Sequence, residues 1–213
     1  MVKVIADPGS THMAKIAYAK ELIDIAIDNH CWAIKFQLFK GLKPNIELPR
    51  EYWHKLWEYS RKHIILFASV FDMEAIELLR EHITPYVKFS FYHGQWWEGI
   101  AKAKQFAKVI VSCSPQNAYL YQEDIIKLLC IPEYPVMYKV DFKEVFKQYS
   151  FDGFSDHTLG YSQTLAAIEA GAGIIEKHIT LAHSDIKCPD STFALKPKQL
   201  KEMMYDIKIR FSD

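Results

Sequence analysis

The chain has 213 residues, half of them apolar, and its 26 basic and 26 acidic side chains give a formal net charge of zero. This length and apolar content favour one domain, residues 1–213, with a substantial core, and they exclude a disordered or fibrous chain. The balanced charge excludes the electropositive surface of a dedicated nucleic-acid-binding protein.

The N-terminus and the cysteines indicate where such a chain would work. The sequence MVKVIADPGS has no basic, apolar leader, and the densest apolar stretch, residues 64–71, is too short to cross a bilayer. The four cysteines lie far apart without a CxxC pair, which indicates neither a disulfide framework nor a cysteine zinc site. We therefore expect an unprocessed, soluble protein of the reducing cytoplasm.

Short apolar runs alternate with longer amphipathic stretches along the whole chain, a pattern typical of β/α units with a parallel sheet. The expected strands are residues 2–6, 32–38, 64–69, 86–90, 109–112, 126–130, 151–155 and 173–178. Helical spacing is clearest in residues 15–29, 51–63, 73–82, 161–170 and 197–211, and less defined in 95–106 and 116–123.

Eight β/α units of this length predict a closed (β/α)₈ barrel, a TIM barrel, near the lower size limit of about 200 residues for that fold. An open doubly wound sheet is the alternative. That fold would favour a glycine-rich phosphate loop after a strand, and neither GxGxxG nor GxxxxGK[ST] occurs. We therefore expect the barrel.

In such a barrel the active site lies at the C-terminal ends of the strands. The polar residues expected there are Asp7, Ser10, Thr11, His12, Lys35, Gln37, Ser69, Lys88, Ser90, Ser112, Glu133, Tyr134, Ser155, Asp156, His157, Thr158, Glu176, Lys177, His178 and Thr180. Lys35 and Lys88 lie within apolar strands, where a charge is costly unless it is paired or used. They could still point outward and extend beside a helix. If they point inward, two lysines with several serines indicate a site for an anion such as phosphate.

His157 and His178 end the seventh and eighth expected strands, so they should be close in space. Two neutral imidazoles can bind a divalent metal and leave positions open for water or substrate. A purely structural role for both histidines is the alternative.

The motifs around these residues resemble the sialic acid synthase (N-acetylneuraminate synthase) family over nearly the whole chain. They are IADPGSTH at 5–12, AIKFQLFK at 33–40, FSDHTLG at 154–160, IIEKHIT at 174–180 and CPDSTFALKP at 188–197. The SDHTxG and EKHxT pair, in this order near the end of a barrel, is the most specific of them.

The resemblance implies an enzyme that condenses phosphoenolpyruvate with an N-acyl amino sugar or related aldehyde, using a divalent metal, Mn²⁺ or Mg²⁺. It assigns the metal to His157 and His178, and the catalytic and phosphoenolpyruvate-binding positions to Asp7, Lys35, Lys88 and Asp190. The further substrate-binding positions that it implies are Gln37, Ser69, Ser90, Ser112, Tyr134 and Ser155. A homodimer is a possible assembly.

Several family positions differ where the sugar would bind. The first motif ends in THMA instead of NHNG, STPF is replaced by SVFD at 69–72, and KIGSGE by KFSFYH at 88–93, so that His93 occupies the position of the family's glutamate. The family's small C-terminal antifreeze-like domain has no counterpart in these 213 residues. We therefore expect an acceptor other than N-acetylmannosamine, or one that is bound weakly.

Two other functions stay open at this stage. The chain could be a catalytically reduced barrel that acts as a phosphoenolpyruvate- or metal-binding or assembly module. It could also be a metal-dependent hydrolase or aldolase, with Asp7, His12 or Asp190 as a further metal ligand.

Overall fold

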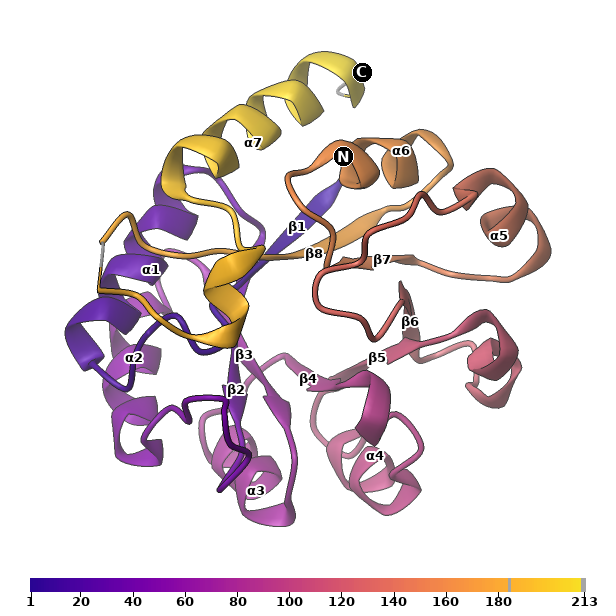
Figure 1. Cartoon of the computed structure of the whole chain (residues 1–213). Coiled ribbons are helices and arrows are strands. Elements are labelled where there is room, and N and C mark those ends of the chain that lie inside the picture. The colour runs from indigo at the N-terminus through magenta and orange to yellow at the C-terminus, as the bar shows by residue number, and fades with distance from the viewer. Residues whose placement is uncertain (184, 212–213) are drawn as a thin grey trace.

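The computed structural model describes residues 1–183 and 185–211. Eight parallel strands close into a barrel in chain order, with β8 paired to β1, and the helices surround them (Figure 1). The strands are β1 (Lys3–Asp7), β2 (Ala33–Leu38), β3 (Ile65–Val70), β4 (Tyr86–Phe89), β5 (Lys108–Cys113), β6 (Ile126–Cys130), β7 (Gly153–Asp156) and β8 (Ile174–His178). The predicted (β/α)₈ barrel is confirmed.

The α-helices are α1 (Ile16–Asp28), α2 (Trp53–Ser60), α3 (Met73–Glu81), α4 (Trp97–Ala103), α5 (Phe142–Gln148), α6 (Ser162–Glu169) and α7 (Pro197–Phe211). Short 3₁₀ helices are η1 (Arg50–Tyr52), η2 (Phe91–His93), η3 (Pro115–Leu120) and η4 (Pro189–Thr192). None of the helices in the described ranges is long and apolar enough to cross a membrane.

Three helical segments differ from expectation. Helix α4 is shorter than residues 95–106, and the segment expected at 116–123 is the 3₁₀ helix η3, which begins with Pro115. Helix α5 was not expected at all. The sequence did contain an N-capping residue for this helix, Asp141. Its carboxylate accepts a hydrogen bond from the Glu144 backbone N–H at 3.2 Å and so caps the first turn.

The interior of the barrel is divided into an apolar and a polar part. Ile5, Ala33, Phe67, Ile110, Leu128 and Ile174 form the apolar inner cluster, whereas a larger core lies between the strands and the helices. Inward-facing positions alternate along each strand, so the residue two places further along points into the same interior. In each of these six strands that next position lines the pocket described below.

Candidate active site

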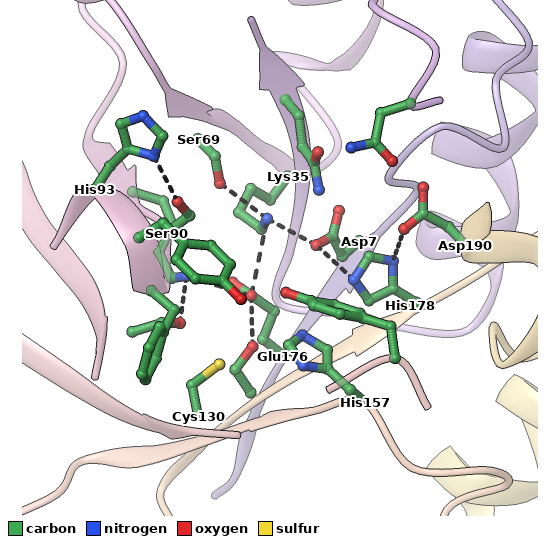
Figure 2. A pocket seen from close by; sticks show the side chains of 18 of the residues that line it. Asp7, Lys35, Ser69, Ser90, His93, Cys130, His157, Glu176, His178 and Asp190 are labelled. Carbon is green, nitrogen blue, oxygen red and sulfur yellow. Dashed lines mark hydrogen bonds and ion pairs between the residues drawn. The ribbon is translucent and has the colours of Figure 1, made fainter. Parts of the chain in front are cut away.

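A pocket of about 460 Å³ opens at the C-terminal ends of the strands (Figure 2). All twelve residues that the sequence assigned to the site line this one pocket: Asp7, Lys35, Gln37, Ser69, Lys88, Ser90, Ser112, Tyr134, Ser155, His157, His178 and Asp190. The resemblance therefore selected side chains that meet in one pocket. Eight of the other polar residues expected at the strand ends are not among its lining residues: Ser10, Thr11, His12, Glu133, Asp156, Thr158, Lys177 and Thr180.

Eight side chains, one from each strand, form what we call the floor of the pocket: Asp7, Lys35, Ser69, Lys88, Ser112, Cys130, Ser155 and Glu176. None of the eight residues is more than 3% exposed. The alternative that the two lysines extend outward beside the helices is wrong, since both turn into the barrel.

Lys35 is held at the centre of the floor by two carboxylates. Its Nζ lies 2.7 Å from Asp7 Oδ2 and 3.8 Å from Glu176 Oε1, and it donates a hydrogen bond to Ser69 Oγ at 3.0 Å. Burial alone would lower the pKa of Lys35, but the charges of Asp7 and Glu176 outweigh burial and raise it. Lys35 is therefore a fixed cation.

Lys88 is held less tightly than Lys35. Its Nζ donates to Ser112 Oγ at 2.7 Å and lies 3.4 Å from Glu176 Oε1. Burial lowers the pKa of Lys88, and the attraction of Glu176 only partly offsets this. Lys88 is thus the floor cation that gains most from a further anion in the pocket.

Glu176 joins the two lysines. The sequence places it among the polar residues expected at the strand ends, but the resemblance assigned no role to it. Its Oε1 accepts a hydrogen bond from Ser155 Oγ at 2.9 Å, whereas the buried Oε2 has no hydrogen-bond partner among the described residues. Burial would raise the pKa of Glu176, but Lys35 and Lys88 hold it below its usual value. The signal was present in IIEKHIT, because period-two alternation places Glu176 on the same face as His178.

The two histidines stand above the floor on β8 and directly after β7. Their ring centroids are 5.6 Å apart, and Phe193 packs edge-on against His178 with centroids 4.9 Å apart. His157 Nδ1 lies 3.0 Å from the Ile131 carbonyl oxygen, so Nδ1 carries the proton and donates it, which leaves the lone pair on Nε2. Burial, assisted by His178, lowers the pKa of His157 to about 4, so its imidazole is neutral at pH 7.

Two carboxylates flank His178. Asp7 Oδ2 lies 3.4 Å from its Nε2, and Asp190 Oδ1 lies 3.6 Å from its Nδ1. Asp190 Oδ2 is fixed by the Ser10 backbone N–H at 2.8 Å. Gly9, with φ +51°, makes room for this contact, because a Cβ there would lie 2.6 Å from the Asp190 carboxylate carbon.

The rim of the pocket, as we use the term, comprises ten of the lining residues that lie outside the strands: Leu42, Lys43, Asn45, Phe71, Phe91, Tyr92, His93, Tyr134, Pro189 and Phe193. His93 Nδ1 lies 3.1 Å from Ser90 Oγ, and its ring packs edge-on against Phe71 with centroids 4.8 Å apart. The Tyr134 ring covers His157 at 4.2 Å between centroids. His93 and Cys130 line the pocket although the sequence interpretation did not include them in the site.

The arrangement offers two imidazoles with carboxylates close by as donors for a metal. No group of three or more His, Cys, Asp or Glu side chains is gathered tightly enough to enclose a metal ion, as far as the described residues go. His157 and His178 are the two residues of this pocket that could hold a metal ion while leaving coordination positions open.

Several known proteins resemble this chain in sequence and in structure. An N,N'-diacetyllegionaminic acid synthase of Campylobacter jejuni is 28% identical over 96% of this chain and 75% of its own length. The N-acetylneuraminate-9-phosphate synthase of Mus musculus is 25% identical, covering 97% of this chain and 69% of its own length. The crystal structure of an N-acetylneuraminic acid synthetase from Leptospira borgpetersenii superposes with a TM-score of 0.84 at 26% identity, over 98% of this chain and 83% of that one.

A sequence model of the NeuB family matches residues 41–211, which is most of the chain. This match includes both histidine motifs and Lys88, while Asp7 and Lys35 lie on the two strands before it. The chain belongs to the NeuB family.

Proposed function

We propose that this protein condenses phosphoenolpyruvate with the aldehyde of an N-acyl amino sugar or a related acceptor, giving a 2-keto acid of the nonulosonate type and inorganic phosphate. The observation that carries the proposal is the joint presence, in one pocket, of two buried strand lysines, hydrogen-bonded serines and a histidine pair. The named family relatives, synthases of legionaminic acid and N-acetylneuraminate 9-phosphate, support the same class of product.

The floor suits phosphoenolpyruvate because that substrate carries both a phosphate and a carboxylate. Lys88 and Ser112 would bind one anionic group, with Ser155 beside them, while Lys35 and Ser69 would bind the other. Buried hydrogen-bonded lysines are expensive to keep without an anion or a carboxylate partner. In the free protein Asp7 and Glu176 serve as that partner.

A divalent cation, Mn²⁺ or Mg²⁺, would be held by His157 and His178. The fit rests on the neutral state of His157, the lone pair on its Nε2, and the buried Nδ1 of His178, which has no hydrogen-bond partner among the described residues. When bound, the cation would polarise the aldehyde oxygen of the acceptor as a Lewis acid.

The chain's own residues then account for the remaining requirements. C3 of phosphoenolpyruvate attacks the aldehyde carbon, water adds at C2 and phosphate leaves. Lys35 and Lys88 stabilise the charge on the substrate throughout. Glu176 Oε2, which has no partner among the described residues, is the acceptor available for a proton of the attacking water, and Asp7 or Asp190 would hold or deprotonate the acceptor's hydroxyl groups.

Calorimetric titration with phosphoenolpyruvate, with and without Mn²⁺, tests the binding half of this proposal. Phosphate release in the presence of a panel of N-acyl hexosamines and simpler aldehydes tests the chemistry. We expect saturable binding and acceptor-dependent phosphate release. Binding without release for any acceptor would instead identify a catalytically reduced binding module, and absence of binding would refute the enzyme.

A further inference from the structure

The two histidine motifs contain a second pair of residues that the proposed mechanism does not use. Asp156 immediately precedes His157, and Lys177 immediately precedes His178. In the parallel pairing of β7 with β8, Asp156 and Lys177 are directly opposite each other. Neighbouring residues on a strand point to opposite faces, so the histidines line the pocket while Asp156 and Lys177 are absent from its lining.

Asp156 and Lys177 form a fully buried network behind the barrel wall. Lys177 Nζ lies 3.1 Å from Asp156 Oδ2, and both side chains are 0% exposed. Lys177 also donates to the Thr158 carbonyl at 2.6 Å, and Thr164 Oγ1 of α6 donates to Asp156 Oδ2 at 2.6 Å. The backbone N–H and Oγ1 of Thr158 both donate to Asp156 Oδ1, at 2.8 and 2.7 Å.

This network encloses His157. The residue before it, Asp156, and the residue after it, Thr158, are both bonded to Lys177. Lys177 is in turn the residue before His178. The backbone positions of the two histidines are thereby fixed relative to each other from the outer face of the barrel.

An ion pair this deeply buried is poorly explained as a source of stability alone. Replacing such pairs with apolar groups of similar volume is often neutral or stabilising, whereas removing one partner is strongly destabilising. The best-attested use of buried polar groups is to specify one geometry. Residues that orient metal-ligating histidines have that effect, and their loss typically weakens metal binding about 10- to 100-fold.

We infer that Asp156 and Lys177 are a positioning pair that sets the separation and orientation of His157 and His178, and through them the affinity of the pocket for a divalent cation. The inference rests on the proposed function, since it takes the two histidines as the metal ligands. Asp156 and Lys177 then position the two histidines and take no part in the reaction themselves.

The decisive variant is the double substitution Asp156→Asn with Lys177→Met in the full chain. It keeps the approximate shape of both side chains and leaves no unpaired buried charge. We expect thermal unfolding in EDTA close to that of the wild type, Mn²⁺ affinity by calorimetry about 10- to 100-fold weaker, and altered visible absorption bands of the Co²⁺-loaded protein. The matched control is Glu77→Gln with Lys102→Met, which removes a surface ion pair of 3.0 Å between α3 and α4 and should leave the metal affinity unchanged.

The outcomes separate the inference from the proposed function. Wild-type Mn²⁺ affinity and Co²⁺ bands in a folded double variant would overturn the positioning role while leaving the metal site intact. If the wild type binds neither ion, the metal site of the proposed function fails. The positioning role is then decided by the ¹⁵N chemical shifts of the His157 ring, which should change in the double variant as the hydrogen bond to the Ile131 carbonyl is lost, and unchanged shifts would refute it.

Discussion

The floor and the rim of the pocket are built in different ways. Every floor side chain comes from a strand and is at most 3% exposed, and all except Cys130 belong to one network of hydrogen bonds and ion pairs. The rim comes from loops and 3₁₀ turns, and three of its members, Leu42, Tyr92 and Tyr134, are 42%, 73% and 51% exposed. Under the proposed function, the buried charged floor would bind phosphoenolpyruvate, and the more exposed loops of the rim would contact the acceptor.

The strongest test of the floor removes Lys88. In Lys88→Met, Ser112 Oγ and Glu176 Oε1 lose their donor, and the substrate anion loses a buried cation. We expect the rate of phosphate release to fall about 100- to 1000-fold, the usual effect of deleting a preorganised group that stabilises charge. Steady-state kinetics at saturating acceptor measure the loss.

Lys104→Met is the control for this substitution. Lys104 forms a partly exposed ion pair with Asp124 at 2.7 Å, away from the pocket lining. Its removal should leave the rate within about twofold, since surface ion pairs contribute little. A fully active Lys88→Met protein would contradict the role assigned to the floor.

The floor was predictable from the sequence because strands obey a simple alternation. Asp7, Lys35, Lys88, Ser112 and Ser155 all lie at inward positions, and the barrel brings the strand ends together whatever the loops do. Glu176 on β8 was also expected at a strand end, although no role was assigned to it. Alternation along a strand does not predict that Glu176 forms ion pairs with both lysines, because these contacts depend on the stagger between strands.

The rim was less predictable. His93 reaches the pocket through η2, a three-residue turn whose geometry no periodicity specifies. Helix α5 was missed for a related reason, since its seven residues are too few to show a clear apolar period. Short loop-bound elements depend on local capping and tertiary contacts, which one sequence reveals only in part.

The pH dependence of stability should depend more on the buried His12 than on His93 of the rim. His12 is fully buried, with its ring 6.0 Å from that of Phe36 on β2 and its Nδ1 accepting the Ala14 N–H at 3.0 Å, and burial lowers its pKa to about 4. A histidine whose folded pKa is depressed contributes stability above its unfolded pKa, about 6.5, and this stability is lost as the pH falls toward 4. The expected loss is a few kcal/mol, visible in urea unfolding of the metal-free protein between pH 7 and 4.

Substitution of His12 and of His93 in turn tests their contributions to this pH dependence. His12→Gln should flatten this part of the pH dependence, whereas His93→Gln should change it little, because His93 is only half-buried. An equal slope in wild type and His12→Gln would show that other groups cause the acid sensitivity.

The charge of the floor leads to a third prediction, on the coupling between phosphoenolpyruvate binding and metal binding. Asp7 and Glu176 formally neutralise Lys35 and Lys88, so the floor alone has no net positive charge for a multiply charged anion. A divalent cation beside it would supply that charge. We expect phosphoenolpyruvate to bind about 10- to 100-fold more weakly in EDTA than in Mn²⁺, and Mn²⁺ to bind more tightly by the same factor when phosphoenolpyruvate is present.

Calorimetry in both orders of addition measures this coupling. Mg²⁺ serves as a second cation, and a Ca²⁺ titration controls for simple charge screening. Equal phosphoenolpyruvate affinity with and without metal would show that the lysines suffice, and the charge argument would then be wrong.

The smallest effect is expected at the rim, and it bears most directly on the division between floor and rim. His93→Gln keeps a polar side chain beside Ser90 Oγ but removes the titratable ring that packs against Phe71. If the rim contacts the acceptor and the floor contacts phosphoenolpyruvate, the KM for the acceptor should rise, by less than about tenfold, as expected for the loss of one partly exposed contact. The KM for phosphoenolpyruvate should stay the same, and a parallel rise in both constants would mean that the two substrates share the rim, so that the pocket is one continuous site without separate ends.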